Sequence, residues 1–290
     1  MPIAASNGVE ICYEAMGAPG DPTILLVAGL GSQMISWHDD LCAALVARGH
    51  RVVRFDNRDT GLSTHVDGRR AAAAPGPAAA AGAPQVPYLL ADLADDAVAV
   101  LDALAVERAH VVGMSMGGMI AQVVAIGHTT RVASLTSIMS TTGDADVGTP
   151  TPEALAALTA PPAATREASQ DAAVHHAHVW GSPGLFDEAL LRDVAGRAWD
   201  RDGDSSGTAR QLAAIVASGS RSAELARLDV PTLVVHGTAD TLVQPSGGRR
   251  TAEVIPGAEL LMIEGMGHDL APPLWPRLID AVVAHVADHP

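Results

Sequence analysis

Short apolar runs alternate with longer amphipathic stretches along most of this 290-residue chain, and this alternation restricts its fold more than any other feature. The predicted strands are residues 9–14, 23–27, 51–55, 110–112, 132–138, 232–235 and 260–263. Several of them are apolar at successive positions, which is typical of strands covered on both faces. The predicted helices between them are residues 36–48, 89–104, 116–127 and 274–285. This order predicts the α/β class, with a mostly parallel twisted sheet and helices on both faces.

Two segments interrupt the alternation. Residues 71–84 are a low-complexity run of Ala, Pro and Gly, which predicts a surface loop, either a flap beside a site or a passive connection. Residues 149–218 are rich in helical pattern and contain no convincing strand. We expect them to form a helical cap over the carboxyl edge of the sheet, where open α/β sheets bind ligands. The predicted domains are therefore a core of residues 1–148 and 219–290 and a cap of residues 149–218.

Charge and composition exclude some classes of partner. The formal net charge is −15, and all 18 basic residues are arginine. Such an acidic chain is repelled by nucleic acids and by anionic membranes, so neither is an expected partner. No apolar window is long enough to span a membrane, and the first residues lack the pattern of a secretory signal. We expect a cytoplasmic protein in which Cys12 and Cys42 are buried, reduced thiols. The oligomeric state is left open.

A tight turn joins the strand at 110–112 to the helix at 116–127. Gly113 and Gly117 flank Ser115 at two residues' distance on each side, where the chain must fold back sharply and a side chain would collide. The pattern Gly-x-Ser-x-Gly between a strand and a helix is the nucleophile elbow, which exposes the serine hydroxyl above the sheet. The structural alternative is a tight turn that needs its glycines and in which the serine has no catalytic role.

A serine nucleophile needs a base, and the base needs a group that orients it. After the strand at 232–235 comes a Gly-containing loop with Asp240. After the strand at 260–263 comes a Gly-Met-Gly loop with His268. Serine, acid and histidine thus occur in the order expected for this elbow, each just after a strand. The sequence predicts a catalytic triad of Ser115, His268 and Asp240.

The chain resembles the α/β-hydrolase fold family over nearly its full length. The matching pieces are ILLVAGLGSQ, FDNRDTGLS, VVGMSMGG, VPTLVVHGTAD and GMGHD. Within the family it is most similar to actinobacterial esterases of the aclacinomycin methylesterase and lipase/esterase type. The resemblance implies that Ser115 is the nucleophile, that His268 is the general base and later the acid, and that Asp240 orients His268.

The resemblance also implies an oxyanion hole made of backbone N–H groups. One donor is Met116, at the start of the helix after the elbow, where the helix dipole also favours negative charge. The second is Leu30, in a loop where Gly29 supports a close approach of the chain. The family usually has His-Gly-x at this loop, and this chain has Ala28-Gly29-Leu30. Because the donor is a main-chain group, the hole survives the missing imidazole.

Several other motifs point away from cofactors. The run GLGSQM lacks the third glycine of a dinucleotide-binding fingerprint, so no cofactor is expected. Asp171, His175 and His178 share a helical face, and we interpret them as a solvated surface rather than a metal site. We read residues 56–63 as a structural loop in which Arg58 joins neighbouring loops by ionic hydrogen bonds. A direct substrate role for Arg58 or Asp59 is the alternative.

The nucleophile narrows the reaction. Dehalogenases and epoxide hydrolases of this fold use an aspartate at the elbow, and epoxide hydrolases also use tyrosines of the cap, whereas Tyr13 and Tyr88 lie outside the predicted cap. The leading hypothesis is a carboxylic ester hydrolase acting on a small or medium apolar ester, with polyketide methyl esters among the candidates. The alternatives are a carbon–carbon hydrolase, a cofactor-free perhydrolase, or a small-ligand receptor that hydrolyses slowly or not at all.

Overall fold

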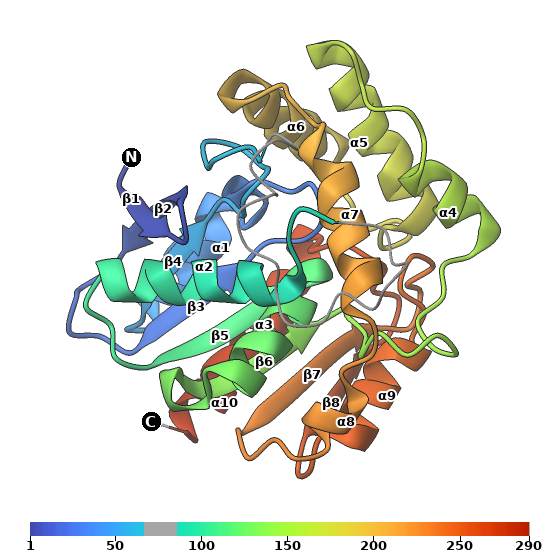
Figure 1. Cartoon of the computed structure of the whole chain (residues 1–290). Helices are drawn as coiled ribbons and strands as arrows, with labels where there is room; N and C mark the ends of the chain where they lie inside the picture. The colour runs from blue at the N-terminus through green and yellow to red at the C-terminus, as the bar shows by residue number, and fades with distance from the viewer. Residues whose placement is uncertain (67–85, 290) are drawn as a thin grey trace.

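Eight strands form one sheet in the computed structural model, which describes residues 1–66 and 86–289 (Figure 1). The strands are β1 (Ile3–Ser6), β2 (Val9–Met16), β3 (Thr23–Val27), β4 (Arg51–Phe55), β5 (Ala109–Met114), β6 (Val132–Ile138), β7 (Thr232–Gly237) and β8 (Glu259–Ile263). Their order is β1-β2-β4-β3-β5-β6-β7-β8. Strands β3 to β8 are parallel, and β1 and β2 pair antiparallel at one edge. The mostly parallel sheet is therefore confirmed, whereas the loop predicted at 71–84 lies outside the described residues.

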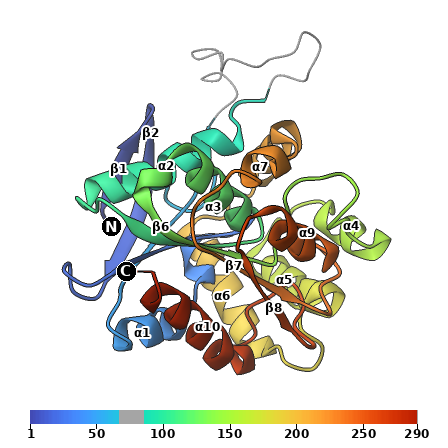
Figure 2. The same cartoon turned by 90° about the horizontal axis from the view of Figure 1, so that it is seen from below.

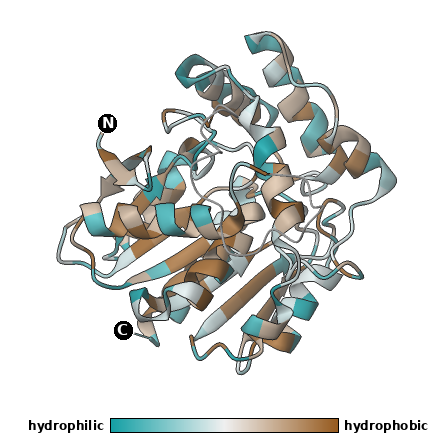
Figure 3. Ribbon diagram, in the orientation of Figure 1, coloured by the Kyte–Doolittle hydropathy of each residue, from teal (hydrophilic) through white to brown (hydrophobic). Residues whose placement is uncertain are grey.

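Helices cover both faces of the sheet, as Figure 2 shows from below. On one face lie α2 (Leu90–Ala103), α3 (Met116–Gly127), α8 (Ser222–Leu225) and α9 (Ser246–Val254). On the other lie α1 (Asp39–Ala47) and α10 (Trp275–Ala287). Alternate residues of β3 enter the two layers, Leu25 and Val27 on one side and Ile24 and Leu26 on the other. This two-sided burial explains why the strand is apolar from Ile24 to Val27, and the central strands are correspondingly brown in Figure 3.

Most predicted elements are present, and the differences have physical reasons. The predicted strands at 23–27, 51–55 and 132–138 and the helix at 116–127 have the expected bounds. The helix predicted from residue 36 begins at Asp39, because the His38 ring accepts the Asp40 N–H at 3.2 Å and caps it there. β1 was not predicted, and β8 is an edge strand with its first two residues, Glu259 and Leu260, exposed to solvent.

We call residues 149–218 the helical segment. It contains α4 (Pro152–Leu158), α5 (Arg166–Trp180), α6 (Glu188–Arg201) and α7 (Gly207–Ser218), which stand together on one side of the sheet in Figure 1. The Gln33 side chain donates to Ala198 O at 2.8 Å, and Arg201 pairs with Asp56. Since Gln33 and Asp56 follow β3 and β4, the helical segment contacts loops at the carboxyl ends of parallel strands.

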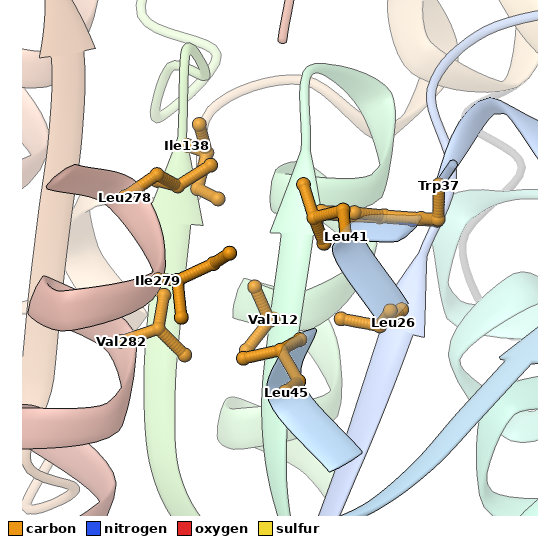
Figure 4. Close-up of a pocket in the computed structure, with 9 residues that line it drawn as sticks. All are labelled: Leu26, Trp37, Leu41, Leu45, Val112, Ile138, Leu278, Ile279 and Val282. Atoms are coloured by element: carbon orange, nitrogen blue, oxygen red, sulfur yellow. The ribbon is translucent and has the colours of Figure 1, made fainter. Parts of the chain in front are cut away.

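A small void lies inside the layer that holds α1 and α10 (Figure 4). Its volume is about 10 Å³, and its lining is Leu26, Trp37, Leu41, Leu45, Val112, Ile138, Leu278, Ile279 and Val282. Because it is apolar and no larger than one water molecule, it is a gap in core packing and not a substrate site. Among the helices of residues 1–66 and 86–289, none is both long and apolar enough to cross a membrane.

Candidate active site

The turn between β5 and α3 has the strained geometry of a nucleophile elbow. Ser115 has φ 55° and ψ −123°, which few non-glycine residues adopt. A Cβ atom at Gly113 would lie 2.0 Å from Gly117 O, and one at Gly117 would lie 2.1 Å from Val27 O. Glycine is therefore required at both positions for α3 to start directly above the strand end. The Ser140 hydroxyl donates to Ser115 O at 2.8 Å and helps to hold this backbone.

Ser115, His268 and Asp240 lie in one chain of hydrogen bonds. His268 Nδ1 is 2.7 Å from Asp240 Oδ2, and His268 Nε2 is 2.9 Å from Ser115 Oγ. A carboxylate can only accept, so His268 Nδ1 carries a proton and donates it to Asp240. The free Nε2 then accepts the Ser115 hydroxyl, which is the arrangement that a general base requires.

Asp240 is buried and held by several donors. Its Oδ1 accepts the N–H groups of Leu242 and Val243, each at 2.9 Å. Burial by itself would raise the pKa of Asp240, but the charge of His268 and the hydrogen bonds from His236 and His268 outweigh it and lower that pKa to about 2. Asp240 is consequently ionised at neutral pH.

A second histidine, His236, touches the same carboxylate and was not singled out by the sequence. It is fully buried at the end of β7, with Nε2 2.8 Å from Val243 O and 3.4 Å from Asp240 Oδ2. Because the Val243 carbonyl accepts, His236 Nε2 carries the proton, and the ring braces the loop that presents Asp240. The only signal in the sequence is its place directly after the apolar run Leu233–Val235 and just before Gly237.

The two predicted oxyanion donors, Met116 and Leu30, belong to two segments that adjoin Ser115. Met116 is the first residue of α3, so its N–H has no acceptor within the helix. In the second segment, a Cβ atom at Gly29 would lie 3.3 Å from Ser115 Cβ, which places the Gly29–Gly31 loop directly against the serine. The Gly31 N–H donates to Gln211 Oε1 of α7 at 2.8 Å, so the helical segment holds this loop.

The loop after β4 connects neighbouring elements through the side chains of Arg58 and Asp59. Arg58 makes two hydrogen bonds to the buried Asp96 carboxylate, at 2.6 and 2.7 Å, and a third to Asp92 O. Asp59 accepts two hydrogen bonds from Arg210 of α7, at 2.9 and 2.7 Å. Both side chains are thus engaged in ion pairs with neighbouring helices, as the structural interpretation of this loop expects.

The polar face of α5 is exposed to solvent at Asp171, His175 and His178, as expected. Asp171 pairs with Arg192 at 2.8 Å, and the ring of His178 makes an edge contact with Phe186. Across the described part of the chain, no three His, Cys, Asp or Glu side chains are grouped so that they could hold a metal ion. Cys12 and Cys42 are both buried and unpaired.

The fold and the elbow define a class of protein. The α/β hydrolase fold family model matches residues 22–271, and the chain belongs to this family. Two relatives are similar over almost their whole length. They are the rhodomycin D methylesterases DauP of Streptomyces sp. (strain C5) and DnrP of Streptomyces peucetius, both 32% identical to this chain. The matches cover 96% of this chain and 95% of DauP, and 97% of this chain and 96% of DnrP.

Solved structures of the same fold align over nearly the whole chain. The enol-lactonase of Burkholderia xenovorans LB400 has a TM-score of 0.74 and 26% identity, with 99% of this chain and 100% of that one covered. The esterase RhEst1 of Rhodococcus sp. ECU1013 has a TM-score of 0.76 and 22% identity, with 100% and 99% covered. At that identity, RhEst1 shows the likeness of fold alone.

Proposed function

We propose that this α/β hydrolase is a carboxylic ester hydrolase that works through a Ser115–His268–Asp240 triad and an acyl-enzyme. The observation that carries the proposal is the unbroken hydrogen-bond chain from Asp240 through His268 to Ser115 Oγ, with distances of 2.7 and 2.9 Å. The proton positions that this chain requires are those of a base ready to deprotonate the serine. Two methylesterases as full-length relatives support the same class of reaction.

The steps follow from the geometry. Ser115 Oγ attacks the ester carbonyl carbon while His268 Nε2 takes the hydroxyl proton, and Asp240 stabilises the imidazolium. The carbonyl oxygen becomes an oxyanion, and the N–H groups of Met116 and Leu30 are proposed to bind it. His268 then returns the proton to the leaving alkoxide. In the second half, His268 deprotonates a water that attacks the acyl-enzyme, and the carboxylic acid and free Ser115 result.

We assign a methyl ester of an apolar acid as the substrate class, because both full-length relatives are named as methylesterases. The helical segment would serve as the cap that encloses this substrate, since it is anchored to loops at the carboxyl edge of the sheet. We also propose a cytoplasmic location. The buried, unpaired Cys12 and Cys42 fit a reducing compartment.

The test compares three proteins with p-nitrophenyl acetate, a panel of aromatic methyl esters, and an organophosphate serine probe. We expect wild type to turn over esters and to be labelled once, at Ser115. We expect Ser115→Ala to lose at least about 10³-fold in kcat and to remain unlabelled, because the nucleophile is gone. Ser134→Ala is the matched control, since Ser134 is a buried serine of β6 that bonds His110 instead of His268. An unlabelled wild type, or full turnover by Ser115→Ala, would exclude the serine mechanism.

A further inference from the structure

Three consecutive residues of the loop that presents His268 are bonded to the end of helix α5. The Gly267 N–H donates to Ser182 Oγ at 2.9 Å, and the His268 N–H donates to Trp180 O at 2.6 Å. The Asp269 carboxylate accepts the Ser182 N–H at 3.0 Å and the Ser182 hydroxyl at 2.5 Å. The residues before and after His268 are therefore both tied to one side chain, Ser182, and His268 itself is tied to the helix end.

The backbone at Gly181 and Ser182 is tightly packed against the loop that presents His268. Ser182 is fully buried. A Cβ atom at Gly267 would lie 2.3 Å from both the carbonyl carbon and the oxygen of Gly181. A Cβ atom at Gly181 would lie 2.6 Å from Ala177 O and 2.9 Å from Asp269 Oδ2. The two backbones are packed against each other at a distance that only glycine permits, so a shift of one must move the other.

The same helix end also reaches the acid. The Thr241 hydroxyl, on the residue after Asp240, donates to Val179 O at 2.8 Å. The last turn of α5 is consequently bonded to the loop of the acid and to the loop of the base, although both loops belong to the strands β7 and β8. Helix α5 lies outside the sheet, and these hydrogen bonds are main-chain or short side-chain bonds, which tolerate little displacement.

The base loop needs such external support. Two of its residues, Gly265 and Gly267, are glycines with the widest backbone freedom, and Gly265 has φ 73°. The hydrogen bonds from the Gly265 N–H to Thr238 Oγ1 and from the Ala239 N–H to Met266 O, both at 2.9 Å, hold the loop only as far as Met266. A catalytic group has to be held to within about 0.5 Å of its productive position, and a misplacement of about 1 Å costs about 100-fold in rate.

We propose that Ser182, a residue of the helical segment, positions His268 for proton transfer. Ser182 does not touch the reacting atoms, and it acts by holding Gly267 and Asp269 on both sides of the base. The helical segment would then contribute to the chemical step itself and not only to the enclosure of substrate. This inference rests on the serine esterase mechanism proposed above.

The decisive variant is Ser182→Ala, which removes the acceptor for Gly267 and the hydroxyl donor to Asp269. We expect kcat for p-nitrophenyl acetate and the rate constant of organophosphate labelling of Ser115 both to fall about 10- to 100-fold, as displacement of the base predicts. KM should stay within about three-fold. Ser182→Thr keeps the hydroxyl and should be labelled faster than Ser182→Ala, whereas an effect unrelated to the hydroxyl would leave the two variants equally slow.

Thr165→Ala is the matched control. Thr165 caps the other end of α5 and accepts the Ala168 N–H at 3.1 Å, so its loss weakens the same helix without touching the base loop. The Thr165→Ala variant should react with the organophosphate probe at the wild-type rate. If Ser182→Ala does not fold, Asp269→Ala removes the two hydrogen bonds between Ser182 and Asp269, leaves the one to Gly267, and should also slow labelling.

Wild-type kcat and labelling rates in the folded variant would overturn the role of Ser182. That result differs from a failure of the proposed function, in which wild type itself is not labelled at Ser115. A loss of rate in Thr165→Ala as large as in Ser182→Ala would also contradict the inference, because the effect would then come from α5 as a whole.

Discussion

The helical segment meets the core at two junctions of different chemistry. At the first, which we call the ionic junction, the buried carboxylates of Asp56 and Asp59 pair with Arg201 and Arg210. At the second, which we call the base-loop junction, the end of α5 is joined to the loop of His268 by main-chain groups and the short side chain of Ser182. The first joins elements through long side chains, and the second through almost direct contact of backbones.

The difference separates stability from geometry. An arginine reaches its partner through a flexible stem, so the helices it anchors can move slightly while the ion pair persists. A hydrogen bond between main-chain groups loses strength quickly when either group moves. We therefore expect the ionic junction to determine how firmly the helical segment is attached, and the base-loop junction to determine how well His268 is placed.

The largest expected effect is on stability at the ionic junction. Asp59→Asn keeps the shape of the side chain but removes the charge that Arg210 and the Tyr88 hydroxyl share. Breaking a fully buried ion pair from one side costs about 3–5 kcal/mol, and because Arg210 is partly exposed we expect the lower end, about 3 kcal/mol. Urea unfolding should show this loss, while the rate of organophosphate labelling of the folded protein stays within a few-fold of wild type.

The same substitution on an exposed pair gives the comparison. Asp280→Asn breaks the pair with Arg48, in which both side chains are at least half exposed. It should change the free energy of unfolding by less than about 1 kcal/mol. A cost for Asp59→Asn as small as this, or a loss of labelling as large as that expected for Ser182→Ala, would contradict the division of roles between the junctions.

Gln211 is expected to affect both the attachment of the helical segment and the geometry of the site, and its substitution should have the next largest effect on stability. This fully buried side chain of α7 donates to Arg58 O and accepts the Gly31 N–H, both at 2.8 Å. Gln211→Leu leaves both groups unpaired, which costs about 2–3 kcal/mol of stability. It also frees the loop that carries Leu30, a proposed oxyanion donor, so we expect about a 10-fold lower kcat.

The matched control is Gln170→Leu, which removes a bond of 2.8 Å from α5 to Arg192 O within the helical segment. It should leave kcat unchanged. If Gln211→Leu lowers the free energy of unfolding but leaves kcat unchanged, the contact between Gln211 and the Gly31 N–H does not influence the reaction. The expected effect of Gln211 on the site would then be wrong.

The strands and the site motifs could be predicted because their signals are local. Ile24–Val27 is apolar at every position because both faces of the strand are buried, and Gly113 and Gly117 are required by the turn around Ser115. Ser182 and Gln211 carry no such signal. Each acts on a loop far away in the sequence, so only the packing of the helical segment against the core gives them a role.

The borders of elements were harder to predict where a single side chain decides them. His38 sets the first residue of α1, because its ring accepts the Asp40 N–H and caps the helix. The start of the chain was also missed as a strand, because β1 has only four residues and pairs with β2 alone at the sheet edge. Short edge strands lack the long apolar run that identifies a central strand.

The smallest effect concerns the charge of the Asp240 carboxylate, and it depends on pH. The pKa of Asp240 is lowered from 3.8 to about 2 in the folded protein, so the folded state favours the ionised form. Its contribution to stability is therefore complete above about pH 4 and is lost as the pH falls towards 2, with a size of about 2 kcal/mol. In urea unfolding, the difference between wild type and Asp240→Asn should narrow by about that amount between pH 5 and pH 2. A difference that stays constant over this range would mean that the folded state does not favour the ionised form of Asp240, and that shape and not charge holds this side chain beside His268.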